Sequence, residues 1–300
     1  MHQPVLLKEV IHYLNPKPGE HFIDATINGG GHALALLAKT VPSGKLLGID
    51  WDPEILKKLE QSIHDESLRE RMILVNDNFA RIGEIAELYH FRPVHGILLD
   101  LGFSSYHIEQ SGGGFSFQRD EPLDMRYHRA ASSGGSYQTA AEILNTFSGE
   151  KLENIFKEFG EERFAGRIAD EIVRVRISRA IQTTFDLVHA IKVATPVWYQ
   201  RRKIHSATKV FQALRIAVNH ELENIARALS ASFELLVPGG NIAVISFHSL
   251  EDRLVKNTFK EKAEQGVIEI ITPKPIKAAR GEIAVNPRSR SAMLRVVKRL

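Results

Sequence analysis

Short apolar runs alternate with longer amphipathic stretches over the first hundred residues. Four runs predict buried strands, at 21–26, 46–50, 72–77 and 95–102. The helix-like segment after the second run starts at Asp52-Pro53, a capping residue followed by proline. Strands and helices that alternate in this way predict right-handed crossovers and a parallel sheet. The strands lack polar alternation, which is typical of a sheet covered by helices on both faces.

The pattern changes after residue 102. Two glycine clusters lie within 103–138, and residues 139–193 have helical spacing. A long helix is expected from Ser206 to about Phe233, ending before the break at 238–240, Pro-Gly-Gly. Strand-like runs return near the C-terminus, at 241–247, 267–272 and 293–299.

These patterns predict an α/β fold with a discontinuous core. Residues 1–104 and 206–300 are expected to form a nucleotide-binding parallel sheet. Residues 105–205 are expected to form a helical insertion domain. The chain has 300 residues, which is enough for one large domain or two.

Composition narrows the class of protein. The chain is 43% hydrophobic and 25% charged, as globular proteins are. Its longest apolar run, 33–38, is far shorter than the ~20 residues that cross a bilayer, and no signal peptide is evident. We therefore expect a cytoplasmic protein without a membrane partner. The absence of cysteine excludes disulfides, thiolate metal sites and a thiol nucleophile, and no HExxH motif indicates a metal.

Charge is concentrated at the C-terminal end. The net charge is +3, but residues 271–300 contain eight basic residues and one acidic residue. This segment therefore carries +7, and the preceding 270 residues carry −4. Such asymmetry is typical of a protein with a polyanionic partner, although a solvated basic tail is the alternative.

A glycine-rich loop, DATINGGGH at 24–32, lies between the first strand and the first helix. Glycines there let a ligand approach the backbone and the N-terminus of the helix. Asp50 follows Gly31 by 19 residues and ends the second strand, where an acid binds ribose hydroxyls. The spacing fits neither GxxxxGK[ST] nor GxGxxG. A loop that does not cradle a pyrophosphate suits S-adenosylmethionine (SAM).

Three further residues follow from this interpretation. Asp77 and Phe79, after the third strand, are expected to flank the adenine. Asp100 ends the fourth strand and is expected near the methyl donor, since ligands bind at the carboxyl ends of strands in open sheets. A helix or turn cap is the alternative role for Asp100.

The segment Ser246–Asp252, SFHSLED, combines serine, histidine and acidic residues. A hydrolase triad is one interpretation, but a GxSxG motif is absent. Helix capping after the strand is the favoured interpretation. His248 is also expected near the substrate cleft, where it would touch the target base.

Several long blocks resemble the bacterial 16S ribosomal RNA (cytosine-N4) methyltransferase family. They include GILLDLGFSSYHIE, GEERFAGRIA, HSATKVFQALRIAVNHELE and LVPGGNIAVISFHSLEDRLVK, and the resemblance extends from residue 3 to about 296. It implies a Rossmann-like SAM-dependent methyltransferase that modifies the exocyclic N4 of a decoding-centre cytidine. Asn28 stands where the family has glycine, and asparagine tolerates the left-handed backbone. The SAM-binding positions that the resemblance implies are Gly30, Gly31, His32, Asp50, Phe79, Asp100 and His107.

The residues also constrain the chemistry. A chain without cysteine cannot attack cytosine C6 with a thiolate, whereas an exocyclic amine needs no covalent intermediate. Positioning and electrostatics are then the main sources of rate. Asp100 is the expected acceptor near the amine, with Ser104 and Ser105 as helpers.

The expected partner is 16S rRNA in the small ribosomal subunit, and no feature specifies an oligomeric state. The arginines of the insertion, Arg163, Arg167, Arg174, Arg176 and Arg179, form either an RNA face or a solvated face. Alternative functions are another nucleic-acid amino-methyltransferase, an NAD-linked oxidoreductase, and an RNA-binding module with a degenerate nucleotide fold. The residues expected to contact RNA are Arg119, Arg126, His205, Arg215, His248, Arg288 and Arg290.

Overall fold

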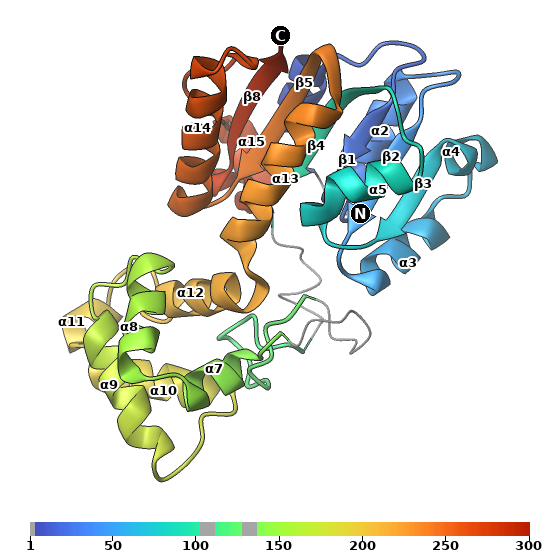
Figure 1. Ribbon diagram of the computed structural model, residues 1–300. Helices are drawn as coiled ribbons and strands as arrows, with labels where there is room; N and C mark the ends of the chain where they lie inside the picture. The colour runs from blue at the N-terminus through green and yellow to red at the C-terminus, as the bar shows by residue number, and fades with distance from the viewer. Residues whose placement is uncertain (1–3, 103–111, 128–136) are drawn as a thin grey trace. The chain divides into compact units, whose positions relative to one another are not determined.

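The computed structural model describes residues 4–102, 112–127 and 137–300. The chain forms two compact units, 1–102 with 222–300 and 103–221. We call them the sheet unit and the helical unit (Figure 1). None of the described helices combines the length and the hydropathy needed to span a membrane.

The sheet unit contains an eight-stranded sheet in the order β3-β2-β1-β4-β5-β8-β6, with β7 paired to β8. Strands β1 to β5 are parallel, as predicted, and β8 runs antiparallel to β5, β6 and β7. The strands are β1 (Phe22–Asp24), β2 (Leu46–Asp50), β3 (Met72–Asn76), β4 (Val94–Asp100), β5 (Leu236–Ser246), β6 (Ile268–Ile270), β7 (Ile276–Lys277) and β8 (Met293–Arg299).

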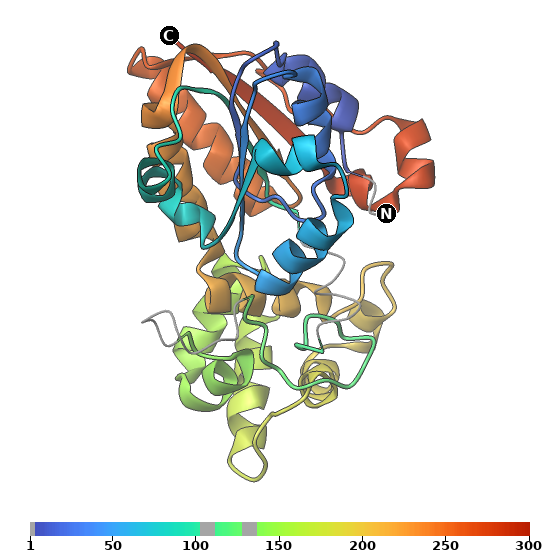
Figure 2. The same cartoon turned by 90° about the vertical axis from the view of Figure 1, so that its right-hand side faces the viewer.

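Helices cover both faces of this sheet, as the uniformly apolar strands predicted. On one face, Ile23 and Ile97 pack with α5, α13 and α14. On the other face, Phe22 and Leu98 pack with α1, α2 and α3, and Figure 2 shows the unit from the side. The helices are α1 (Leu7–Leu14), α2 (Gly31–Lys39), α3 (Pro53–Ser62), α4 (Glu66–Glu70), α5 (Ile82–Leu88), α13 (Glu221–Leu235), α14 (Ser249–Glu264) and α15 (Arg280–Val285).

The helical unit has its own hydrophobic core. Buried side chains such as Phe156, Ile168 and Leu214 pack α8, α9 and α12 together. This agrees with the helical spacing predicted for 139–193. The described helices are α7 (Ala140–Thr146), α8 (Gly149–Glu158), α9 (Ala165–Arg176), α10 (Thr184–Ala194), α11 (Val197–Gln200) and α12 (Thr208–Asn219).

Two expectations about the C-terminal half were wrong. The long helix from Ser206 is divided into α12 and α13, because His220 has a left-handed backbone with φ of 49°. The helical unit consequently extends to Glu221 rather than to 205, since α12 packs on α7 and α8. The second wrong expectation concerns the break at 238–240: α13 ends before it, at Leu235, as expected, but the break does not separate that helix from a new strand. It lies within β5, where the pairing with β4 shifts register between Val94 and Gly96.

Candidate active site

Three aspartates end neighbouring parallel strands of the sheet unit. Asp24, Asp50 and Asp100 are the last residues of β1, β2 and β4, and β1 lies between the other two strands. In the register of the sheet, Asp24 is opposite Gly48 and Leu98. Asp50 and Asp100 therefore extend two residues beyond Asp24 on either side of it. This edge is where ligands bind in open α/β sheets.

The glycine-rich loop after β1 is fixed to the end of β2. The Asn28 N–H donates to Asp50 Oδ2 at 2.9 Å, and the Asp52 N–H donates to Asp50 Oδ1 at 3.0 Å. Asn28 has φ of 46°, which confirms the prediction that asparagine takes the left-handed backbone there. Gly30 caps α2 with φ of 73°, and a Cβ on it would lie 2.5 Å from the Leu59 side chain. The loop therefore requires glycine at this point.

Thr26 joins the end of β1 to the end of β4. Its N–H donates to Asp24 Oδ1 at 3.2 Å, and its hydroxyl accepts the Asp100 N–H at 2.7 Å. The Asp100 carboxylate accepts the Gly102 N–H at 3.1 Å through Oδ1. Sequence reasoning gave Thr26 no role. Its position two residues beyond a strand-ending acid was the only available signal.

His32 lies beside Asp100. Its Nδ1 is 3.7 Å from Asp100 Oδ2, and its Nε2 is 2.9 Å from the Val5 carbonyl oxygen. Because a carbonyl only accepts, Nε2 carries the hydrogen of this bond. The ring is 5% exposed. The chain segment before α1 therefore fixes the orientation of His32 toward Asp100.

Burial changes the protonation of the central aspartate. The side chain of Asp24 is buried, and this desolvation, with smaller effects of the Asp100 and Asp50 charges, raises its pKa to about 8. Asp24 is therefore mainly protonated at neutral pH, while Asp50 and Asp100 supply the carboxylates of the edge. No Lys or Arg occurs between residues 20 and 38. This charge distribution suits a cationic ligand and disfavours a phosphate.

The residues after β3 lie next to the same edge. The Asp77 N–H donates to the Asp50 carbonyl, while the Asp77 carboxylate pairs with Arg81 at 2.7 Å. Asn78, which sequence reasoning missed, caps the short 3-10 helix Phe79–Arg81 by accepting the Ala80 N–H. Phe79 is partly buried against the core. The capping and the ion pair thus fix the start of the segment expected to face adenine.

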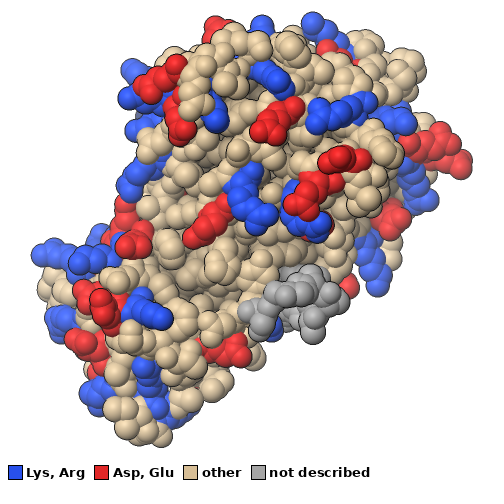
Figure 3. Space-filling model, in the orientation of Figure 1, with Lys and Arg blue, Asp and Glu red and all other residues tan. Residues whose placement is uncertain are grey.

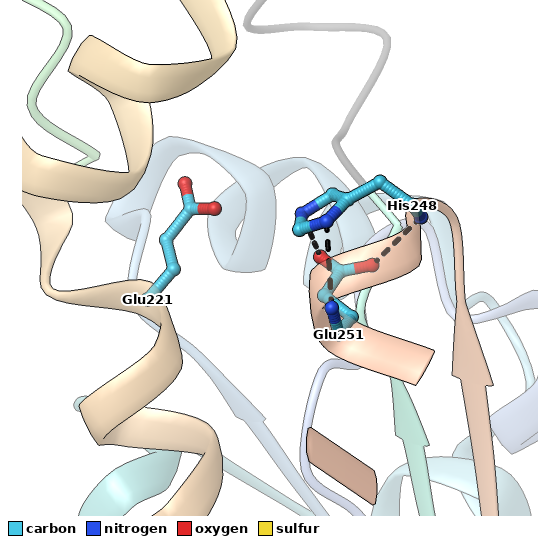
Figure 4. Close-up of side chains that lie close together, drawn as sticks. All are labelled: Glu221, His248 and Glu251. Carbon is cyan, nitrogen blue, oxygen red and sulfur yellow. Dashed lines mark hydrogen bonds and ion pairs between the residues drawn. The ribbon is translucent and has the colours of Figure 1, made fainter. Parts of the chain in front are cut away.

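The segment after β5 caps a helix. His248 is the N-cap of α14, its Nδ1 accepts the Glu251 N–H at 3.4 Å, and its Nε2 is 2.9 Å from Glu251 Oε1 (Figure 4). Glu251 in turn accepts the Phe247 N–H. The Ser246 hydroxyl donates to the Met293 carbonyl. Helix capping is therefore confirmed for this motif, and the Ser246 hydroxyl is bonded to a backbone carbonyl.

The residues expected to contact RNA differ in their surroundings. In the helical unit, Arg126 pairs with Asp124 at 2.6 Å, and this hydrogen bond raises the pKa of Arg126. Arg215 pairs with Glu221 at 2.8 Å. The His205 ring stacks on Phe117 at 4.5 Å.

Arg119 is exposed. Glu221, which pairs with Arg215 and is the third residue drawn in Figure 4, also accepts a hydrogen bond from the Tyr127 hydroxyl. In the sheet unit, Arg288 and Arg290 lie on the 3-10 helix Pro287–Ser291, and Arg290 is exposed. On the face of the sheet unit that is visible in Figure 3, acidic and basic side chains are interspersed. Ser104, Ser105 and His107 lie outside the described residues, so their expected roles stay predictions.

A parallel sheet with one antiparallel strand, a glycine loop and carboxylates at the ends of β2 and β4 defines a Rossmann-like methyltransferase fold. The model of the MraW methylase family matches residues 1–300. The chain belongs to this family, whose cofactor is S-adenosyl-L-methionine.

Curated relatives agree with this assignment. The chain is 43% identical over 314 residues to the Ribosomal RNA small subunit methyltransferase H of Syntrophotalea carbinolica, covering 100% of this chain and 98% of that protein. It is 45% identical over 300 residues to the protein of the same name from Dictyoglomus thermophilum, covering 100% and 97%. Solved structures are less similar. A SAM-dependent O-methyltransferase from Thermotoga maritima has a TM-score of 0.43 and 11% identity, covering 100% of this chain and 68% of that one.

Proposed function

We propose that this chain methylates the exocyclic N4 of a decoding-centre cytidine in 16S rRNA, with SAM as methyl donor. The observation that carries the proposal is the pair of carboxylates, Asp50 and Asp100, at the ends of two strands that flank the glycine loop. The relatives named as ribosomal RNA small subunit methyltransferases support the substrate. The resemblance of the sequence blocks supports the choice of cytidine N4.

The residues at this edge fit the cofactor. We assign the Asp50 carboxylate to the ribose hydroxyls, because two backbone N–H donors already hold it in a fixed orientation. We assign the loop around Gly30 and Gly31 to close backbone approach and Phe79 to the adenine. Asp100 and His32 complete the set, with His107 as a further predicted contact. The negative carboxylates at this edge would stabilise the positively charged sulfonium of SAM, whereas they would repel a negatively charged pyrophosphate.

The proposed chemistry needs few protein groups. Bound SAM supplies an electrophilic methyl group on a positively charged sulfur. The N4 amine loses one proton when its new bond to carbon forms, and Asp100 is the acceptor that we assign near it, with Ser104 as a second group. The Gly102 N–H donates to the Asp100 carboxylate, and the Thr26 hydroxyl accepts the Asp100 backbone N–H, so both parts of the residue are held. Such preorganisation reduces the reorganisation required during the reaction.

RNA binding is assigned to basic residues of both units. We assign Arg288 and Arg290, in the strongly basic C-terminal segment, to phosphate contacts. Arg119, Arg126, His205 and Arg215 are assigned to the same role in the helical unit. His248 remains a proposed contact of the target base in addition to its capping role.

The test is mass spectrometry of small ribosomal subunits and of free 16S rRNA after incubation with the protein and isotope-labelled SAM. The expected product is one labelled N4-methylcytidine, located by nuclease mapping. Label on another nucleobase nitrogen would replace the proposal by a different amino-methyltransferase activity. SAM binding with no labelled RNA in either substrate would remove ribosomal RNA as the substrate.

A further inference from the structure

On the helical unit, the guanidinium group of Arg163 lies over the ring of an exposed tryptophan, Trp198. The Trp198 side chain is 55% exposed, which is unusual for the largest aromatic residue. The Arg163 guanidinium carbon lies 5.7 Å from the centre of the Trp198 ring and 5.8 Å from that of Phe164. Arg167 lies 5.7 Å from the same Phe164 ring. Arginines therefore lie next to one exposed and one half-buried aromatic ring at this place.

Buried contacts hold this arrangement in position. Glu162 is 3% exposed and accepts the Phe164 N–H at 2.8 Å and the Tyr199 hydroxyl at 2.7 Å. Burial and this hydrogen bond to Glu162 raise the pKa of Tyr199. Phe164 precedes α9 and Tyr199 lies in α11, so Glu162 clamps together the two segments that carry Arg163 and Trp198.

The three aromatic rings pack edge to face. Their centres are 4.9 Å apart for Phe164 and Tyr199, 5.8 Å for Trp198 and Tyr199, and 6.0 Å for Phe164 and Trp198. This geometry is the favourable one for aromatic pairs. The exposed ring of Trp198 is thus held in place by its contacts with the Phe164 and Tyr199 rings.

The surroundings of Trp198 are strongly basic. Arg201, Arg202 and Lys203 lie three to five residues after it and are all exposed, and Arg202 lies 5.0 Å from the Tyr199 ring centre. No acidic residue occurs from Leu187 to His220, and basic side chains outnumber the two acids that precede Arg163, the exposed Glu161 and the buried Glu162. The charge around the exposed ring therefore complements a polyanion, and the combination of a supported aromatic ring with arginines is the one that binds unpaired nucleotides.

We propose that these residues, the Trp198 surface (Arg163, Phe164, Arg167, Trp198 and Arg202), bind single-stranded RNA. An unpaired base stacks on Trp198, and the arginines contact the neighbouring phosphates. This proposal rests on the proposed function, because it takes RNA as the substrate. It adds that the helical unit binds an unpaired segment of that RNA. Val197 and Ile204 are also exposed, so a protein partner is the competing occupant.

The test measures binding of the full-length protein to a fluorescein-labelled, 12-nucleotide single-stranded RNA of mixed sequence, and to the same sequence as a duplex. Trp198→Ala is expected to weaken binding of the single strand about 5- to 100-fold. Trp198→Phe keeps an aromatic face and is expected to retain most of the affinity. Arg163→Ala should flatten the salt dependence of binding. Phe185→Ala is the matched control, because Phe185 is 48% exposed on the first turn of α10, the end away from α11.

The outcomes separate the possibilities. An affinity of Trp198→Ala for the single strand equal to that of the Phe185→Ala control, at unchanged melting temperature, overturns the proposal. Binding of Trp198→Ala to the small ribosomal subunit is measured as well. If this variant loses affinity for the subunit but not for the oligonucleotide, the proposal is also overturned, because the surface then contacts a protein. The oligonucleotide experiment involves no methylation. A Trp198-dependent affinity in a protein that fails to methylate 16S rRNA would therefore uphold this surface and refute the proposed activity.

Discussion

The hydroxyl of Thr26 accepts the backbone N–H of Asp100 at 2.7 Å, although the two residues are 74 positions apart in the chain. Thr26 is also bound through its own N–H to the carboxyl group of Asp24. One threonine therefore links the loop after β1 to the carboxylate-bearing end of β4. The position of Asp100 depends on this loop as well as on its own strand.

Replacing Thr26 tests this link. Thr26→Val keeps the shape of the side chain but removes the acceptor, and a polar group left without a partner costs ~1–3 kcal/mol. We expect a loss of that size in the free energy of unfolding, measured by urea denaturation, together with weaker SAM binding. Thr26→Ser retains the hydroxyl and should retain both properties. Equal behaviour of the valine and serine variants would show that the hydrogen bond has no energetic role.

Asp50 is expected to determine SAM affinity. Asp50→Ala removes the acceptor that we assign to the ribose, and it also releases the N–H groups of Asn28 and Asp52. We expect the affinity to fall about 10- to 100-fold by calorimetry. Asp52→Ala is the matched control, because Asp52 caps α3 through the Glu54 N–H and has no assigned contact to the cofactor. That variant should lose about 1 kcal/mol of stability and keep its affinity. Unchanged affinity of Asp50→Ala would remove Asp50 from the cofactor site.

Asp100→Asn is expected to reduce the rate of methyl transfer more than RNA binding. Asparagine keeps the volume but replaces one acceptor oxygen by an NH₂ donor and removes a negative charge facing the sulfonium. The loss of such a preorganised contact typically reduces the rate ~10²–10³-fold. Single-turnover methylation at saturating SAM and RNA separates this step from both binding equilibria. A single-turnover rate near that of the wild type would leave Asp100 with a cofactor-binding or capping role only.

Asp24 is expected to make stability depend on pH. Its pKa is about 8 in the folded chain, against 3.8 for an ordinary aspartate in water. The folded chain therefore holds a proton that the unfolded chain releases between these values, so the free energy of unfolding falls as pH rises from about 4 to about 8. The stabilisation is fully present below this window and is lost above it.

Asp24→Asn tests that expectation, because an amide stays neutral and still accepts the Thr26 N–H. Urea denaturation from pH 5 to 9 should show a weaker decline of stability than in the wild type, and a more stable variant at pH 9. Asp170→Asn, at an exposed position on α9, controls for the change in net charge. Parallel pH profiles for the wild type and Asp24→Asn would contradict the raised pKa.

Local patterns in the sequence were sufficient for much of the sheet unit. The strand predicted at 46–50 coincides with β2, and Asp52 caps α3 as expected. These features depend on apolar runs and on capping residues that act within one turn of the chain. The same holds for the capping role of His248, whose partner Glu251 is three residues away.

The boundaries that the sequence predicted wrongly, at His220 and at 238–240, are each explained by the backbone at that point of the folded protein. The apolar spacing across α12 and α13 is continuous in the sequence, so periodicity alone predicts one helix. The left-handed residue that divides them is a histidine, which does not signal a break as glycine does. Pro238 and Gly239 signal a break, but pairing between β4 and β5 incorporates them in a strand with a shifted register.

By itself, the sequence determined the alternation of strands and helices, the left-handed loop at Asn28 and the acids that end the strands. Only the tertiary structure decided which of those acids is protonated and what holds them. Asp24 has a raised pKa because the sheet and its covering helices exclude water from it, and Asp100 is fixed by a threonine in the loop after β1, 74 residues earlier in the chain. Burial and contacts between distant segments are properties of the packed chain, and no local pattern of residues encodes them.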